Sequence, residues 1–225
     1  MFKAILFDID GTLTDTNPVF LKALKQAYHE FSGEEKPSSF FSFSLGIPSP
    51  QTMEILGIRE AERTTFRERW QGLIREYMPE ARLFPGILEL LTHLQARGVP
   101  MALVTSKIRA EMPYEFDCFG INHFFAFTVC ADDVPRPKPF PDPLLFALDR
   151  LHVSPRQALF VGESLYDLKA AKSAHVPFAL AKWGVPRTEE ILPWQPEYVL
   201  EEPRELLSLL EGRGLRKTLL LGGVE

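Results

Sequence analysis

The sequence predicts an α/β protein built on a doubly wound parallel sheet, and three observations lead to this fold class. Short apolar runs alternate with helical patterns along most of the chain, which is the order expected for a parallel sheet covered by helices on both faces. The first run, residues 4–7, is apolar at every position, as in a strand that is buried on both sides. From residue 16 to residue 82 no strand is predicted, and the apolar residues recur with the helical period.

The other elements of the core follow in chain order. A helix over residues 87–97 is predicted to end at Gly98, a residue type that commonly ends helices. Strands are predicted at residues 99–104, 124–129, 158–161, 176–181 and 198–200. A last helix is predicted over residues 203–210.

The region without strands is interpreted as a helical insert. Its clearest helical patterns cover residues 19–31 and 61–77, and a Pro-Gly pair at residues 85–86 marks a turn beyond its far end. The insert would therefore interrupt the core directly after the first strand. We expect a core domain of residues 1–15 and 83–225 and a helical cap domain of residues 16–82.

Composition limits the classes of function. The 225 residues carry a net charge of -5, which argues against nucleic acid as a partner, because proteins that bind nucleic acids usually present a basic surface. Cys118 and Cys130 occur in unrelated contexts and suggest neither a disulfide nor a zinc site. The chain enters its first strand at once, so we expect no signal peptide, no membrane partner and a cytoplasmic location. The sequence contains no signal for an oligomeric state.

Two acids follow the first strand directly. Asp8 and Asp10 are separated by one residue and precede Gly11. Alternate residues of an extended chain point the same way, and ligands of parallel sheets gather at the carboxyl ends of the strands. Two carboxylates crowded there repel each other unless a cation is present or one is protonated, which suits a metal-assisted nucleophile beside a general acid/base. Alone, the pattern also fits an Asp-Gly turn with solvated acids.

Two later segments carry groups that suit a phosphoryl group. Thr105 ends a strand, and its hydroxyl can donate to phosphoryl oxygens together with the N–H groups that follow at Ser106, although an ordinary helix cap is the alternative. Lys138 lies between prolines that restrict its backbone, so its ammonium can neutralise charge on a transferring phosphoryl group. Asp142 is expected to cap the next helix, with a proline at its first position.

A fourth strand end carries two more acids. Glu163 and Asp167 follow the strand at 158–161 and are four residues apart. If a helix begins near Ser164, both acids can face the same opening, which suits a hard cation such as Mg²⁺. The alternative is a first helical turn that favours acids because of the helix dipole. Four strand ends with these groups in this order form a joint signal that none of the alternatives explains together.

These motifs resemble those of the haloacid dehalogenase-like hydrolase superfamily, particularly its phosphoglycolate phosphatase-like and β-phosphoglucomutase-like branch. The resemblance covers nearly the whole chain. The matching segments are Phe7-Asp8-Ile9-Asp10-Gly11-Thr12-Leu13, then Thr105, then Lys138 within Lys-Pro-x-Pro-Asp, and Gly162-Glu163-Ser164-x-x-Asp167. The resemblance implies a Rossmann-like core with a helical cap that closes over the site.

By this resemblance, the chain is a Mg²⁺-dependent phosphatase of small phosphorylated metabolites. Asp8 would form an aspartyl-phosphate, and Asp10 would protonate the leaving oxygen and then activate water. The resemblance assigns the phosphoryl group to Gly11, Thr12, Thr105, Ser106 and Lys138. It assigns Mg²⁺ to Asp8, the main-chain carbonyl of Asp10, Glu163 and Asp167.

Departures from the family pattern leave alternatives open. The fourth motif usually begins Gly-Asp, so Glu163 would bind the metal either directly or through a water molecule. A phosphomutase of the β-phosphoglucomutase type is the runner-up function, but the expected cap loop of such enzymes has Lys or Arg around a glycine, and Gly46 has neither beside it. A non-catalytic phosphometabolite-binding protein is the third alternative, which the survival of every motif acid disfavours.

The segment between the two cap helices bears on substrate choice. Residues 37–51 contain no lysine or arginine but include Phe40, Phe41 and Phe43. One hypothesis is that these rings offer an apolar surface to the leaving group of the substrate. The other is that they form the core between the cap helices, because aromatic residues at this spacing usually pack inward. Arg59, Arg75 or Arg109 would then supply any cation.

Overall fold

A parallel sheet forms the centre of the molecule in the computed structural model, which describes residues 2–45, 47, 49–184 and 188–212. Within these residues, six strands lie in the order β5-β4-β1-β6-β7-β8, and every neighbouring pair is parallel. Their bounds are Ala4–Phe7 (β1), Met101–Val104 (β4), Thr128–Val129 (β5), Ala158–Gly162 (β6), Phe178–Ala181 (β7) and Tyr198–Leu200 (β8). The predicted α/β class with a doubly wound sheet is confirmed.

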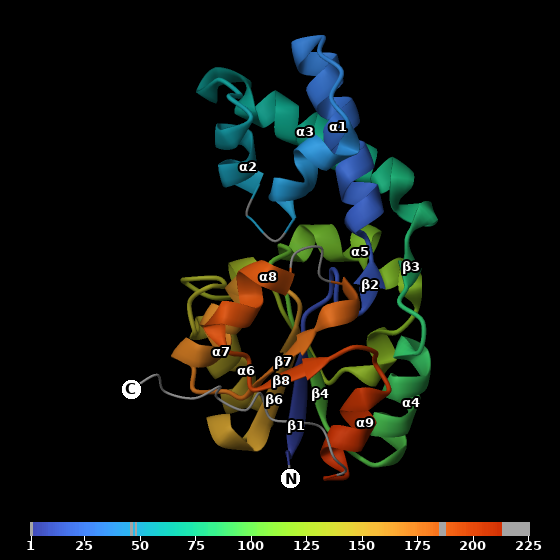
Figure 1. Cartoon of the computed structure of the whole chain (residues 1–225), viewed down its shortest axis with the longest axis vertical. Helices are drawn as coiled ribbons and strands as arrows, with labels where there is room; N and C mark the ends of the chain where they lie inside the picture. Colours follow the sequence, from blue (N-terminus) through green and yellow to red (C-terminus); the bar gives the residue numbers. More distant parts are fainter. Residues whose placement is uncertain (1, 46, 48, 185–187, 213–225) are drawn as a thin grey trace.

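Strand β1 is buried on both faces because its side chains alternate between two apolar layers. Ile5 and Phe7 belong to the layer covered by α4 (Ile87–Ala96) and α9 (Glu205–Leu210). Ala4 and Leu6 belong to the opposite layer, covered by α6 (Asp142–Leu151) and α7 (Leu165–Ser173). Figure 1 shows these two helix pairs on either side of the sheet. Burial on both faces explains why residues 4–7 show no polar alternation.

The predicted elements agree with the structure in order but not in every boundary. The strand expected at 124–129 is wrong for most of its length, because Asn122–Phe124 form a 3-10 helix and only Thr128–Val129 pair with β4. Phe124 is apolar because it packs into the core, and not because it belongs to a strand. Two short helices complete the core, α5 (Met112–Glu115) and α8 (Thr188–Ile191).

A helical part lies beyond the carboxyl edge of the sheet (Figure 1). It consists of α1 (Asn17–Ser32), α2 (Ser49–Ile55) and α3 (Arg63–Tyr77), with a 3-10 helix at Ser38–Ser44. These elements have an apolar core of their own, which includes Val19, Leu24, Phe41, Phe66 and Leu73. The helical cap after the first strand is thereby confirmed, whereas its boundaries at residues 16 and 82 stay a prediction.

A small antiparallel pair joins the two crossings between cap and core, and the sequence did not predict it. β2 (Thr14–Asp15) and β3 (Arg82–Leu83) pair with Thr14 opposite Leu83. Strands of two residues are too short to produce a period, so only their pairing reveals them. The pair holds the entry and exit of the cap side by side. Among the described residues, no helix is both long enough and apolar enough to cross a membrane.

Candidate active site

The predicted nucleophile, Asp8, lies directly after β1 and contacts a buried lysine. Lys138 Nζ donates to Asp8 Oδ1 at 2.8 Å and to Asp167 Oδ1 at 2.6 Å. Lys138 is 5% exposed and Asp167 is fully buried, so this ammonium lies between two carboxylates with little access to water. The structure thus brings together three of the predicted site residues from three separate segments.

Three acids form a cluster that suits a cation. Oxygens of Asp8, Glu163 and Asp167 all lie within 4.8 Å of one another. Three carboxylates against the one Lys138 ammonium leave an excess of two negative charges, which a divalent cation would balance. The pKa of Asp8 is raised to about 6, chiefly by burial, which Lys138 opposes and to which Asp167 and Asp10 add. Burial also raises the pKa of Glu163 well above its usual value, with Asp167 and Asp8 adding to it.

The start of α7 holds Asp167 in place. Ser164 caps the helix by accepting the Asp167 N–H at 3.1 Å. In return, Asp167 Oδ2 accepts the Ser164 N–H at 2.9 Å and its hydroxyl at 2.6 Å. The helix-turn interpretation of this acid therefore holds, because Oδ2 closes a capping box, while Oδ1 faces Lys138 and the metal role of Asp167 stays a prediction.

The loop after β1 makes room for the longer acid of the fourth motif. Gly11 has φ +72°, and a Cβ there would lie 2.8 Å from Glu163 Cγ. The Thr12 hydroxyl donates to Glu163 Oε2 at 3.1 Å. The N–H groups of Gly11 and Thr12 donate to the carbonyls of Thr14 and Ile9. These contacts make Thr12 a support for Glu163, and phosphate binding by Gly11 and Thr12 stays a prediction.

The Asp10 carboxylate is held separately from the three clustered acids. Its Oδ1 accepts from the Thr16 hydroxyl at 2.7 Å, and its Oδ2 lies 3.0 Å from Lys107 Nζ. Lys107 also contacts Glu115 Oε2 at 2.5 Å, and both of these residues are buried. Lys107 and Glu115 were not predicted from the sequence, although Lys107 directly follows Ser106, a predicted site residue.

The two residues of the second motif, Thr105 and Ser106, differ in their exposure to solvent. Thr105 is buried at the end of β4, where its Oγ1 accepts the Lys107 N–H at 3.1 Å, and the hydroxyl proton keeps its capacity to donate. Ser106 is exposed on the same turn, and its phosphate role stays a prediction.

The prediction that Asp142 caps the next helix is wrong. Asp142 is the first residue of α6, and its oxygens instead accept from Arg136 at 3.1 and 3.0 Å.

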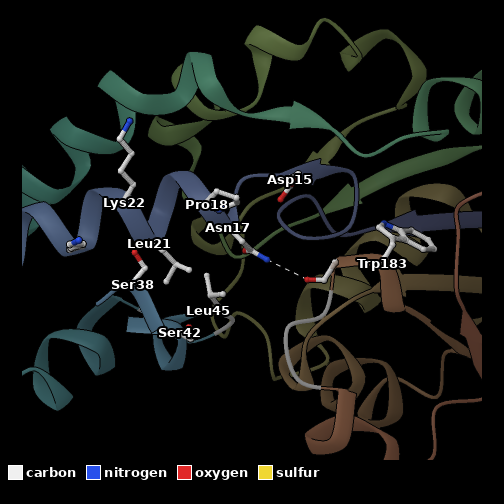
Figure 2. A pocket seen from close by; sticks show the side chains of 11 residues that line it. Asp15, Asn17, Pro18, Leu21, Lys22, Ser38, Ser42, Leu45 and Trp183 are labelled. Carbon is white, nitrogen blue, oxygen red and sulfur yellow. Dashed lines mark hydrogen bonds between the residues drawn. The ribbon is translucent and has the colours of Figure 1, made fainter. Parts of the chain in front are cut away.

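An open cavity of about 640 Å³ lies between the cap and the core. Figure 2 shows Lys22 of α1 and Ser38, Ser42 and Leu45 of the neighbouring segment on its cap side, and Trp183 on its core side. The described phenylalanines of this segment do not line the cavity. Phe41 is fully buried in the cap core and packs edge-on against Tyr28, which supports the core interpretation for this ring, whereas Phe40 is 43% exposed.

The arginines proposed as cations have other contacts. Arg59 pairs with Glu62, Arg75 stacks on Tyr114, and Arg109 pairs with Asp133. Two lysines of α1, Lys22 and Lys25, are among the residues that line the cavity. Lys22 also contacts Glu80 at 2.5 Å.

A family model for haloacid dehalogenase-like hydrolases matches residues 5–181. The chain belongs to this family. The match covers all four motifs, so the resemblance based on them is confirmed. The prediction that the chain is an enzyme, a phosphatase of this family, is confirmed by the family model and by its relatives.

Relatives of this hydrolase include enzymes with two different names. The pyrophosphatase PpaX of Oceanobacillus iheyensis is 29% identical over 210 residues, which cover 92% of this chain and 96% of the relative. The phosphoglycolate phosphatase of Escherichia coli K12 is 30% identical over an alignment 236 positions long, gaps included, and the alignment covers 92% of each chain. The crystal structure of a predicted phosphoglycolate phosphatase from Haemophilus somnus has a TM-score of 0.85 at 25% identity, covering 93% and 98% of the two chains.

In this hydrolase the loop after β7 supports the loop after β1 at close range, and this contact predicts the effect of a mutation. Trp183 Nε1 donates to the Thr12 carbonyl at 2.9 Å, and a Cβ on Gly184 would lie 1.5 Å from the Gly11 carbonyl oxygen. Because the obstacle is backbone, we expect Gly184→Ala to lower stability by about 1–3 kcal/mol and to lower kcat. Thermal unfolding and initial rates measure both effects.

Gly72→Ala in α3 is the matched control for this substitution. Nothing lies within 4 Å of a Cβ at Gly72, so the change should raise stability by roughly 0.5–1 kcal/mol and leave kcat unchanged. An unchanged melting temperature in Gly184→Ala would contradict the close packing of the two loops.

Proposed function

We propose that this hydrolase is a Mg²⁺-dependent phosphatase of small phosphate monoesters that acts through an aspartyl-phosphate on Asp8. The observation that carries the proposal is the buried Asp8 carboxylate, which lies against Lys138 within a cluster of acids at the carboxyl edge of the sheet. A nucleophile, a cation for the phosphoryl oxygens and ligands for a metal thus meet in one place. In the same proposal, residues 16–82 act as the cap domain over a core of residues 1–15 and 83–225.

In the first step, an Asp8 oxygen attacks phosphorus and forms an acyl-phosphate bond while the bond from phosphorus to the leaving oxygen breaks. Asp10 gives its proton to that oxygen, so the leaving group departs as an alcohol or acid. Lys138 and Thr105 hold the phosphoryl oxygens, because both are buried donors, Lys138 in contact with Asp8 and Thr105 at the end of the neighbouring strand β4.

In the second step, Asp10 accepts a proton from water, and the water oxygen attacks phosphorus. The acyl-phosphate bond breaks, phosphate leaves and the Asp8 carboxylate is restored. Asp10 is suited to both roles because Thr16 and Lys107 hold its two oxygens apart from the acid cluster. The same carboxyl group therefore ends the cycle in the protonation state in which it began.

The residues present fit a divalent metal. Asp8, Glu163 and Asp167 would hold it, since three clustered carboxylates suit a hard cation and burial raises the pKa of both Asp8 and Glu163. The main-chain carbonyl of Asp10 is the further ligand that the family pattern implies. When bound, Mg²⁺ supplies positive charge that favours the ionised acids and attracts the phosphoryl group.

The substrate we propose is a small phosphorylated metabolite with an anionic or polar leaving group. Leu21, Leu45 and Trp183 line the cavity under the cap together with Lys22 and Lys25, and the two lysines support an anionic leaving group over an uncharged one. The names of the relatives, phosphoglycolate phosphatase and pyrophosphatase, supply two compounds of this kind.

The function is tested by phosphate release with and without Mg²⁺. The values of kcat/KM for 2-phosphoglycolate, pyrophosphate, a nucleoside monophosphate and 4-nitrophenyl phosphate should be compared on one preparation. We expect turnover only with metal and the highest value for 2-phosphoglycolate or pyrophosphate. A requirement for a sugar bisphosphate activator would identify a phosphomutase instead. Full activity after verified metal removal would reject the proposal.

Metal binding should stabilise the protein more at pH 7.5 than at pH 5.0. Burial raises the pKa of Asp8 from 3.8 to about 6, so the folded state binds this proton more tightly than the unfolded chain does. That contribution to stability is present below about pH 4 and is lost as the pH rises through about 6. A metal ion would bind the ionised acids and would offset this loss of stability. At a metal concentration of 100 times Kd and pH 7.5, we expect the free energy of unfolding to rise by about 2.7 kcal/mol, or Tm to rise by roughly 5–10 °C.

Thermal scans at both pH values with Mg²⁺, Ca²⁺ or chelator measure this effect. Ca²⁺ should stabilise the protein but support little turnover, because it prefers looser geometry and more ligands. Glu163→Gln should reduce the shift with Mg²⁺, whereas Glu35→Gln at an exposed position should not. A shift at pH 5.0 that equals the shift at pH 7.5 would contradict the assignment of these acids.

A further inference from the structure

A buried ion pair lies beside Asp10, and neither of its members takes a direct part in the two chemical steps. Lys107 and Glu115 are 5% and 4% exposed, and their charged atoms lie 2.5 Å apart. Burying two charges costs several kcal/mol per ion, and a buried pair is often no more stable than apolar residues of the same size. Stability alone is therefore a weak reason for this pair, and its contact with Asp10 suggests a functional one.

The backbone around Lys107 directs its side chain toward Asp10. The Lys107 N–H donates to Thr105 Oγ1 at 3.1 Å, and its carbonyl accepts the Ala131 N–H at 2.8 Å. Lys107 is thus fixed in the turn that ends β4, one of the two strands that flank β1. Glu115, the last residue of α5, anchors the ammonium. The pair is formally neutral, so Lys107 reaches Asp10 without adding net charge to the site.

Both oxygens of Asp10 are held, one by a residue at the entry to the cap and the other by a residue of the core. Thr16, directly before α1, donates to Oδ1 at 2.7 Å, while Lys107 Nζ lies 3.0 Å from Oδ2. Phe20 of α1 covers the ammonium, with its ring centroid 4.8 Å from Nζ. The orientation of the Asp10 carboxylate therefore depends on a core residue, Lys107, and on the first turn of the cap.

We propose that Lys107, anchored by Glu115, is a positioning residue that holds the Asp10 carboxyl group in the orientation needed for proton transfer to the leaving oxygen. The inference rests on the proposed function, because it acts through Asp10. Burial opposes the charge on Lys107, but Asp10 and Glu115 outweigh it and raise the pKa of Lys107 above its usual value. The group therefore remains an ammonium throughout the working pH range and keeps its hydrogen bond donors.

The test is a double-mutant cycle with two aryl phosphates of similar shape. Wild type, Lys107→Met, Asp10→Asn and the double variant are compared on phenyl phosphate, a poor leaving group, and on 4-nitrophenyl phosphate, a good one. Lys107→Met should lower kcat on phenyl phosphate by about 10²-fold, the cost of a misplacement of about 1 Å, with little change in KM. The loss should be smaller on 4-nitrophenyl phosphate. In the Asp10→Asn background Lys107→Met should cause no further loss.

Two further variants keep the test sharp. Glu115→Gln preserves shape and an acceptor oxygen, so it should fold and show a smaller loss with the same dependence on leaving group. Lys36→Met removes a lysine paired with Glu34 on the cap surface and should behave as wild type. If Lys107→Met fails to fold, Glu115→Gln decides the question, and equal losses on both phosphates in that variant would overturn the inference.

The outcomes separate this inference from the proposed function. Normal activity in Asp10→Asn would overturn both, because Asp10 would then carry no proton. A second outcome is that Asp10→Asn shows the expected loss while a folded Lys107→Met protein has normal rates. This outcome would overturn the positioning role alone. A rise in KM that persists in the double variant would also overturn it, since Lys107 would then bind the substrate directly.

Discussion

Replacing Asp8 with asparagine is expected to abolish turnover, with a loss on the order of 10⁵–10⁶-fold, the range found when a covalent nucleophile is removed. An amide oxygen is a poor nucleophile, and an amide cannot form the acyl-phosphate. The fold should survive, because asparagine has the same shape and β1 keeps its apolar residues in the two layers of the core. Removing one of three crowded acids should leave the metal-free protein at least as stable as wild type.

Phosphate release at high enzyme concentration measures this loss, and mass spectrometry of quenched wild-type enzyme reports the phosphorylated intermediate. Asp149→Asn, at an exposed position of α6, is the matched control and should retain full activity. Substantial turnover by carefully purified Asp8→Asn protein would mean that a different group attacks phosphorus.

Asp10→Asn is expected to produce the second largest loss, ~10²–10⁴-fold, the usual contribution of a general acid/base. The size of this loss in rate should depend on the substrate, because a good leaving group needs less protonation. Rates on phenyl phosphate and 4-nitrophenyl phosphate provide the comparison, and the loss should be larger on phenyl phosphate. The substitution keeps an oxygen that can accept from Thr16 or Lys107, so these contacts need not collapse.

Equal losses on the two aryl phosphates would contradict the acid role of Asp10. They would leave Asp10 as a structural partner of Lys107 and Thr16 only. Intermediate trapping adds a second measurement, since slow hydrolysis in Asp10→Asn should allow the aspartyl-phosphate to accumulate with 4-nitrophenyl phosphate.

Much of the fold could be predicted because its signals are local. A strand buried on both faces, such as β1, must be apolar at consecutive positions, and a cap helix such as α1 must repeat its apolar residues every three or four positions. The missed elements lack such signals. The pair of β2 and β3 has two residues in each strand, and the apolar run near Phe124 reflects burial in a 3-10 segment.

The site was predictable to the same extent as the topology. In a parallel sheet the carboxyl ends of the strands meet at one edge, so Asp8, Lys138 and Asp167 could be expected together from their places after strands. Hydrogen bond partners could not be inferred in this way. Glu115 lies in a short helix with no motif of its own, and only packing reveals that it anchors Lys107.

The sequence by itself determined the class of fold, the order of the strand ends and the chemistry that meets there, since these follow from local periodicity and from residue types. The tertiary structure decided which groups touch. It placed Lys107 on Asp10, the Thr12 hydroxyl on Glu163, and the ring of Phe41 in the cap core instead of the cavity. Such contacts join segments far apart in the chain, and their geometry depends on how whole layers pack, which no local pattern records.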